Sequence, residues 1–99
     1  MFFYVYLLES LKTGDWYLGF TDDLQRRVEE HNKGFNRSTK PHTPWRLLYY
    51  EAHLNKFGAL RREKYLKTTL GLRALRRMLH EQIHAKAHSS RKSTTWYAK

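Results

Sequence analysis

The chain has 99 residues, no cysteine and a formal net charge of +10, from 19 lysines and arginines against 9 acidic residues. This length allows one domain, the lack of cysteine excludes disulfides and cysteine zinc sites, and no apolar run is long enough to span a bilayer. The basic excess indicates a polyanionic partner, with nucleic acid as the first expectation and an anionic membrane surface as the second.

Two short aromatic runs, residues 4–6 and 16–19, are predicted to form a β-hairpin. The residues between them include a Lys-Thr-Gly-Asp stretch that is typical of a hairpin loop. Because alternate side chains of a strand share a face, one register places Tyr6 and Tyr17 on the same face, with open backbone at Gly19 beside them. Core packing is the alternative role for two such tyrosines.

A helix is predicted to follow the hairpin, with Thr21 or Asp22 as its cap and Gly34 at its end. Its apolar stripe, formed by Leu24 and Val28, is expected to face the sheet.

Two charged or titratable residues of this helix fall beside that apolar stripe. At about 100° per residue, His31 lies on its edge and Arg27 lies one turn before His31. Arg26 points almost the opposite way, into solvent. A solvated flank is the alternative interpretation of Arg27 and His31.

Residues 35–44 are a polar loop with the composition of a phosphate-facing segment. An ordinary surface loop is the alternative. Residues 45–51 read as a third strand because they are aromatic and apolar. The candidate nucleic-acid contacts in these two segments are Arg37, Ser38, Thr39, Lys40 and Arg46.

A second helix is predicted to begin at Asn55 or Lys56 and to run to about residue 69, with Gly71 as its stop. Glu63 falls in the middle of its apolar face. An ionised carboxylate there is costly unless it meets a cation or a metal. Two interpretations stay open, a buried ion pair, for instance with Arg27, and a metal ligand in a cleft. The apolar residues of this face are Ala59, Leu60, Leu66 and Leu70.

A third helix is predicted from residue 72 to about residue 87, with Leu72, Leu75, Leu79 and Ile83 on one face. Three histidines recur every fourth residue on a neighbouring face, a spacing that can bind a transition metal. Without a carboxylate or cysteine partner, a solvated basic flank is the preferred interpretation. We expect a domain of residues 1–88 and a flexible basic tail of residues 89–99. The three histidines are His80, His84 and His88.

Two phenols, an arginine, a histidine and a glutamate are the parts that phosphodiester hydrolysis needs. Arg27 can bind the phosphate with its planar guanidinium, and Glu63 can hold a divalent metal at the leaving oxygen. A single oxygen ligand suits Mg²⁺. Tyr17 is a candidate general base, His31 a proton relay or the base itself, and Tyr6 a hydrogen-bonding partner of the water or of Tyr17.

Taken in order, several motifs resemble the GIY-YIG nuclease superfamily, and within it the small stand-alone proteins related to the nuclease domain of the excision-repair incision subunit. The resemblance covers about residues 2–80. It implies an α+β domain, a three-stranded antiparallel sheet flanked by about three helices, that cleaves DNA, usually with Mg²⁺. Mn²⁺ stays open as an alternative metal. The motifs are Tyr4-Val5-Tyr6, Tyr17-Leu18-Gly19, residues 23–32, Ser38-Thr39-Lys40-Pro41, Pro44-Trp45 and residues 59–64.

The resemblance also implies roles for individual residues. Tyr6 and Tyr17 would be the two motif tyrosines, with Tyr17 as the base. Arg27 would be the helix arginine, His31 its companion, and Glu63 the metal ligand.

The chain departs from the family pattern at three positions. Phe20 stands where some members place a lysine, and no asparagine follows Glu63, whereas some members use a late asparagine. Tyr4 replaces the first glycine, a common variation. The missing lysine and asparagine bear on the rate of the reaction and leave the expected fold unchanged.

The sequence therefore predicts a metal-dependent DNA endonuclease, acting in repair, recombination or on branched DNA. Family members that recognise a specific DNA sequence commonly carry an added DNA-binding domain. For a chain of one domain we therefore expect a preference for DNA structure or a targeting protein partner. RNA as a substrate stays open. The alternatives are a nucleic-acid-binding module without turnover and an interaction protein that docks an acidic partner. We expect a cytoplasmic protein, because no signal-peptide pattern is present and Met1 leads directly into the first strand.

Overall fold

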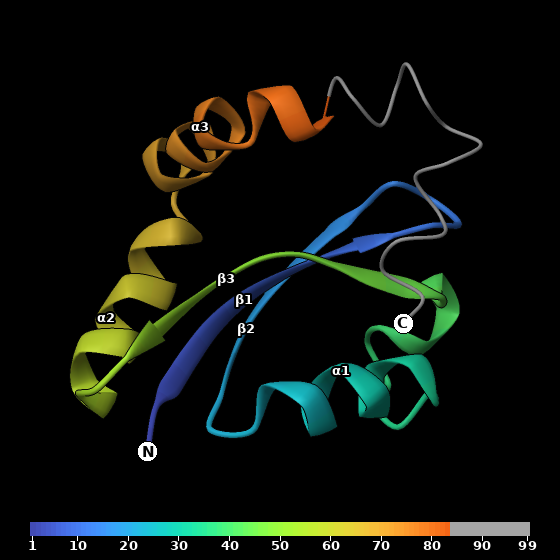
Figure 1. Ribbon diagram of the computed structural model, residues 1–99. Coiled ribbons are helices and arrows are strands. Elements are labelled where there is room, and N and C mark those ends of the chain that lie inside the picture. The colour runs from blue at the N-terminus through green and yellow to red at the C-terminus, as the bar shows by residue number, and fades with distance from the viewer. Residues whose placement is uncertain (84–99) are drawn as a thin grey trace.

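Three strands form an antiparallel sheet in the computed structural model, which describes residues 1–83 (Figure 1). They are β1 (Phe3–Ser10), β2 (Trp16–Thr21) and β3 (Trp45–His53), in the order β2-β1-β3. All three are rich in aromatic and aliphatic residues, which suit a half-buried pleated surface. The predicted α+β class and three-stranded antiparallel sheet are confirmed. The boundary at residue 88 and the tail lie outside the described residues.

The hairpin register places the two motif tyrosines on one face of the sheet. Tyr6 lies opposite Gly19, and Tyr17 lies opposite Leu8, so all four residues share that face. The turn is stabilised by Ser10, whose Oγ accepts the backbone N–H groups of residues 12 and 13 at 3.1 and 3.0 Å. This is one of the registers that the sequence allowed.

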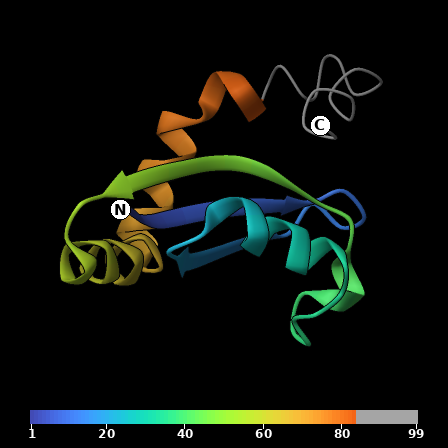
Figure 2. The ribbon, with the colours of Figure 1, turned by 60° about the horizontal axis from the view of Figure 1, so that its bottom comes forward.

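Helices cover the two faces of the sheet unequally. Figures 1 and 2 show α1 (Leu24–Asn32) on one side and both α2 (Lys56–Leu66) and α3 (Thr69–Met78) on the other. Each fully buried leucine contributes roughly 1.5–3 kcal/mol, so most of the hydrophobic stabilisation lies on the α2–α3 side. The buried residues of that side are Val5, Leu7, Leu18, Leu48, Ala59, Leu66, Leu75 and Leu79. Those of the α1 side are Tyr6, Leu8 and Trp45, with Leu24 and Val28 packed against them.

Helix α1 begins slightly later than the sequence predicts. Its N-cap is Asp23, whose side chain accepts the N–H of Arg26 at 3.2 Å. Thr21 is still part of β2, and its hydroxyl accepts the N–H of Asp23 at 3.1 Å. The predicted caps Thr21 and Asp22 are therefore wrong, whereas the predicted stop is confirmed, since Gly34 adopts a φ of +79° just after the helix.

The second predicted helix ends at Leu66 instead of near residue 69, and the third begins at Thr69 instead of residue 72. Asn55 caps α2 as expected, because its side chain accepts the N–H of Gly58 at 2.9 Å. Thr68 then caps α3, and its side chain accepts the N–H of Gly71 at 3.1 Å. Gly71 lies in the first turn of α3, where a Cβ atom would come within 2.6 Å of Leu66 Cα. The predicted stop at Gly71 is wrong because this glycine allows close helix packing.

The last helix was predicted correctly in its buried face. Leu75 and Leu79 are buried, and Ile83 packs against the same core. The helix α3 ends at Met78, and residues 80–83 are helical after a turn at Leu79. His80 is exposed, while the other two histidines of the predicted row lie outside the described residues. No helix within residues 1–83 is long and apolar enough to cross a membrane.

Candidate active site

The absence of a side chain at Gly19 allows the phenol of Tyr6 to lie over β2. A Cβ atom at Gly19 would come within 2.5 Å of Tyr6 Oη and 2.6 Å of Tyr6 Cζ. Real Cβ atoms do not approach other atoms so closely, so any larger residue at this position would force the Tyr6 ring to shift. The phenolic end of Tyr6 is thereby directed toward β2, one of the two edge strands of the sheet.

A hydrogen-bonded chain runs from α1 through Tyr6 into the loop of residues 35–44. Arg27 Nε donates to Tyr6 Oη at 3.4 Å, and Tyr6 Oη lies 2.8 Å from His31 Nε2. The other ring nitrogen, His31 Nδ1, lies 2.9 Å from Thr39 Oγ1. Tyr6, His31 and Thr39 are each at most 1% exposed. This chain is the largest group of buried polar side chains on the α1 side of the described structure.

Burial favours the uncharged forms of both Tyr6 and His31. It raises the pKa of Tyr6 to about 12, against the opposing hydrogen bond from Arg27. It also lowers the pKa of His31 to about 4, and the positive charge of Arg27 lowers it further while Glu30 opposes the change. The hydrogen bond to Tyr6 raises the pKa of Arg27. The cluster therefore combines a neutral phenol, a neutral imidazole and a permanent cation.

Tyr17 borders this chain without a hydrogen bond to it. Its ring centroid lies 4.9 Å from that of His31 and 6.3 Å from that of Tyr6. Its side chain is half-buried, whereas Tyr6 is buried. The two phenols therefore lie on one face, as predicted, but differ in their access to solvent.

Arg27 and Arg26 are separated by the helix as the sequence predicts. Arg27 is 35% exposed and donates from Nη1 to Glu30 Oε1 at 3.2 Å. Arg26 is 66% exposed and lies 3.9 Å from the second oxygen of Glu30. One carboxylate therefore anchors both arginines to the surface of α1.

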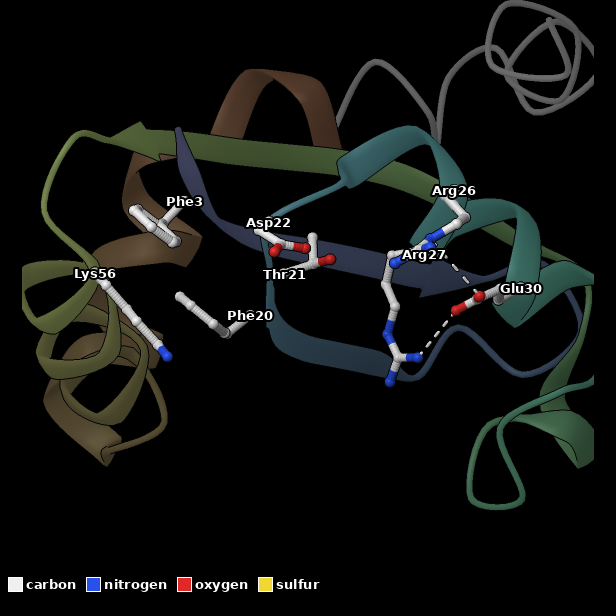
Figure 3. Close-up of a pocket in the computed structure, with 8 residues that line it drawn as sticks. All are labelled: Phe3, Phe20, Thr21, Asp22, Arg26, Arg27, Glu30 and Lys56. Atoms are coloured by element: carbon white, nitrogen blue, oxygen red, sulfur yellow. Dashed lines mark hydrogen bonds and ion pairs between the residues drawn. The ribbon is translucent and has the colours of Figure 1, made fainter. Parts of the chain in front are cut away.

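A cleft of about 310 Å³ lies beside Arg27, between the start of α1 and the start of α2. Figure 3 shows Arg27 and Glu30 on one wall, with Lys56 and Phe20 on the other. The rings of Phe20 and Phe3 lie parallel, with centroids 6.2 Å apart and an interplanar angle of 6°. Phe20, which stands where some family members have a lysine, is thus an aromatic wall of a cleft that also contains the Lys56 side chain.

Glu63 lies on α2, away from the centre of the core. Its side chain is 18% exposed, and its carboxylate pairs with Lys67 Nζ at 3.1 Å. Its charge also contributes to the raised pKa of Tyr6, after burial and Tyr17. Leu70 is 65% exposed because it belongs to α3, so the predicted continuous apolar face is wrong. The ion-pair partner is Lys67, whereas the sequence suggested Arg27 as an example.

The donor set around Glu63 suits a weakly held hard cation. Among the described residues, no three His, Cys, Asp or Glu side chains are grouped so that they could hold a metal. A single, partly exposed carboxylate is enough for Mg²⁺ coordination, because this ion keeps several waters and takes further oxygen ligands from a substrate phosphate. Glu63 is therefore compatible with a Mg²⁺ ligand.

Two of the five candidate nucleic-acid contacts are buried. Arg46 is 1% exposed and its Nε pairs with Glu9 Oε1 at 3.0 Å. Thr39 is 1% exposed and faces His31. The prediction that these two side chains contact nucleic acid is wrong, because neither reaches the surface. The three that remain exposed are Arg37, Ser38 and Lys40.

Sequence reasoning missed the residue that joins α1 to β3. Asn32 Nδ2 donates to the carbonyl oxygen of Trp45 at 3.0 Å, and Asn32 Oδ1 accepts the N–H of Trp45 at 2.6 Å. This double hydrogen bond fixes the end of α1 next to His31. It joins residues 13 positions apart, and no local pattern in the sequence indicated it.

Comparisons with known proteins agree on one family. A family model described as the GIY-YIG catalytic domain matches residues 2–75, which contain all of the candidate catalytic residues. A UPF0213 protein of Halobacterium salinarum is 42% identical over 65 residues, covering 65% of this chain and 83% of that protein. The UPF0213 protein YazA of Bacillus subtilis is 39% identical over 67 residues, covering 67% of this chain and 65% of that protein.

A solved structure belongs to the same group of relatives. It is the solution NMR structure of a UPF0213 protein from Bacillus halodurans, with 34% sequence identity to this chain. The match covers 96% of this chain and 95% of that one, with a TM-score of 0.44.

Proposed function

The chain belongs to the GIY-YIG catalytic domain family, and on this basis we propose that it is a Mg²⁺-dependent endonuclease that hydrolyses phosphodiester bonds in DNA. The observation that carries the proposal is the joint position of Arg27, Tyr6, His31 and Tyr17 at the β2 side of the sheet. These residues supply a cation for a phosphate and hydroxyl groups for a water, which are the elements of phosphoryl transfer to water.

Arg27 binds the scissile phosphate in this proposal. Its guanidinium is anchored at two points, by Tyr6 and by Glu30, and still lines the open cleft of Figure 3. Such a fork can donate two parallel hydrogen bonds to non-bridging phosphate oxygens. Anchoring lowers the entropy that is lost when the side chain engages the substrate.

Tyr17 is the proposed general base, because its half-buried phenol is more accessible than the buried phenol of Tyr6 and its ring lies beside His31. A water oxygen attacks phosphorus, the phenolate form of Tyr17 takes the proton of that water, and the bond to the leaving oxygen breaks. Tyr6, already bonded to Arg27 and His31, has a remaining lone pair with which it orients the water or Tyr17.

Glu63 is the residue that would hold Mg²⁺. When bound, the ion supplies a Lewis acid that stabilises negative charge on the leaving oxygen. The carboxylate is held near the surface by an exposed lysine, Lys67, which can release it to a cation.

The test is cleavage of a labelled panel of single-stranded, duplex, flap and four-way-junction DNA with Mg²⁺, Mn²⁺ or a chelator. Glu63→Ala should lose about 1,000-fold in cleavage while its DNA affinity stays within about threefold of wild type. Glu29→Ala is the matched control, because Glu29 is an exposed carboxylate on α1 outside the cleft. Undiminished cleavage by Glu63→Ala would remove Glu63 from the mechanism.

The same panel addresses the finer parts of the proposal. Preference for a flap or a junction would support action on branched DNA, and an RNA version of the panel would decide between the two nucleic acids. The second candidate function is a binding module without turnover, which the net charge of +10 and the phenylalanine at position 20 favour. Binding without cutting, in wild type and variants alike, would establish that module instead.

A further inference from the structure

Both ring nitrogens of the buried His31 have a hydroxyl group as partner. Nε2 lies 2.8 Å from Tyr6 Oη, and Nδ1 lies 2.9 Å from Thr39 Oγ1. A neutral imidazole carries one proton, so one nitrogen donates and the other accepts. A hydroxyl can donate to one nitrogen or accept from the other. The direction of donation along the hydrogen-bonded series is therefore decided by the groups at its two ends.

The hydrogen-bonded series ends at a backbone carbonyl, which can only accept, and at a guanidinium, which can only donate. At one end, Thr39 Oγ1 donates to the carbonyl oxygen of Asn36 at 3.4 Å. At the other end, Arg27 Nε donates to Tyr6 Oη at 3.4 Å. Thr39 is then free to accept from His31 Nδ1, and His31 Nε2 accepts the proton of Tyr6. The reverse polarity would leave the Tyr6 proton without an acceptor among the described residues.

We propose that Thr39 is a positioning residue, which fixes His31 in the Nδ1–H tautomer and thereby directs the Tyr6 hydroxyl proton to His31 Nε2. Tyr6 Oη then keeps a lone pair with which it orients the attacking water or Tyr17. The effect on cleavage rests on the proposed nuclease function, whereas the tautomer of His31 does not.

The position of Thr39 is built by tertiary contacts. Its backbone carbonyl accepts from Trp45 Nε1 at 3.0 Å, and Trp45 is itself 2% exposed. The backbone of Trp45 is held in turn by Asn32 at the end of α1. These contacts place the Thr39 hydroxyl against His31 as part of the core on this side of the sheet.

The tautomer is measured directly from two-bond ¹H–¹⁵N correlations of the His31 ring at neutral pH. Because burial lowers the pKa of His31 to about 4, the doubly protonated ring does not interfere there. We expect Nδ1 to be protonated in wild type. Thr39→Val removes the hydroxyl and keeps the side-chain shape, and it should shift the ring toward the Nε2–H form. Thr39→Ser keeps the hydroxyl and should retain the wild-type signature.

The same two variants are compared in the cleavage assay. Thr39→Val should lower kcat about tenfold with KM within about twofold of wild type, since it removes one buried hydrogen bond that orients the site. Thr39→Ser should restore kcat to within about twofold of wild type. A purely structural role would instead follow the stability of the variants and leave the tautomer unchanged.

Two results would overturn the inference. One is an Nε2–H tautomer in wild type, which decides the question even if Thr39→Val does not fold. The other is wild-type cleavage by a Thr39→Val variant that keeps the Nδ1–H form. Absence of cleavage by wild type would overturn the proposed nuclease and the effect on kcat, while the spectra would still decide the link between Thr39 and His31.

Discussion

Two buried polar clusters lie on opposite faces of the same sheet. Glu9 and Arg46 face each other across β1 and β3 on the α2–α3 side, with side chains 8% and 1% exposed. Tyr6, His31 and Thr39 lie on the α1 side and are equally buried. The first cluster is an ion pair, whereas the second is a chain of neutral groups that ends at a partly exposed arginine.

The two clusters illustrate two roles of buried polar groups, one structural and one suited to chemistry. The charges of Glu9 and Arg46 neutralise each other in the interior, where neither reaches a solute. The hydrogen-bonded groups around Tyr6 are neutral. They are linked to the open cleft through Arg27, which a bound molecule can contact there. Burial of polar groups alone therefore does not mark a site; a connection to an open surface does.

The largest expected effect on stability is that of Arg46→Met, which removes one partner of the buried ion pair. The substitution leaves the carboxylate of Glu9 buried without its arginine, so the free energy of unfolding should fall by about 3–5 kcal/mol. Urea denaturation measures it, and the double variant Glu9→Gln with Arg46→Met should recover part of the loss. A decrease below about 1 kcal/mol would show that the pair contributes little to stability.

The neutral cluster should make the free energy of unfolding depend on pH. The pKa of His31 is lowered from 6.5 to about 4, so between these values the unfolded chain binds a proton that the folded chain does not. Stability is therefore lost as the pH falls from about 6.5 to 4, by about 3 kcal/mol in total. Urea denaturation of wild type and His31→Gln at several pH values isolates this contribution. Parallel curves for the two proteins would contradict it.

Gly19→Ala tests whether the geometry of Tyr6 matters separately from its presence. The added Cβ would displace Tyr6 Oη, from which it would otherwise be only 2.5 Å away. We expect cleavage to fall about 100-fold, because a shift of about 1 Å would misplace the hydroxyl that orients the attacking water or Tyr17. Gly58→Ala is the control, since its Cβ meets nothing closer than 3.8 Å. Equal cleavage by the two variants would argue against a role for the Tyr6 hydroxyl.

The smallest expected effect concerns the surface. Arg37 is exposed in the loop of residues 35–44, whereas Arg46 is buried. Arg37→Ala should reduce the slope of log Kd against log salt concentration by about 1, and Arg46→Met should leave it unchanged. DNA binding at several salt concentrations measures both. A change of slope in the Arg46 variant alone would reverse the assignment.

Local pattern was sufficient for much of this fold. Alternation and composition predicted all three strands, and helical periodicity separated Arg27 from Arg26 and placed Leu75 and Leu79 in the core. These features depend on which face of an element a residue occupies, and that is set by backbone geometry alone. Gly34 was recognised as a helix end for the same reason, since its positive φ is a local requirement.

Features that depend on distant partners were missed or misread. The break between α2 and α3 is enforced by the packing of Gly71 on the end of α2, and helical periodicity across the break wrongly joined Leu70 to the face of α2. Thr39 and Arg46 have the composition of surface contacts, and their burial follows from His31 and Glu9, which lie far away along the chain.

The sequence by itself determined the elements, their faces and the family to which the chain belongs. Only the tertiary structure decided the partners of the buried polar groups. A residue type states which hydrogen bonds and charges a side chain offers, while the partner depends on which segments the fold brings together. The same hydroxyl and guanidinium groups can therefore face a phosphate or a buried histidine and glutamate, and it is the closure of the loop and of β3 against β1 that selects between them.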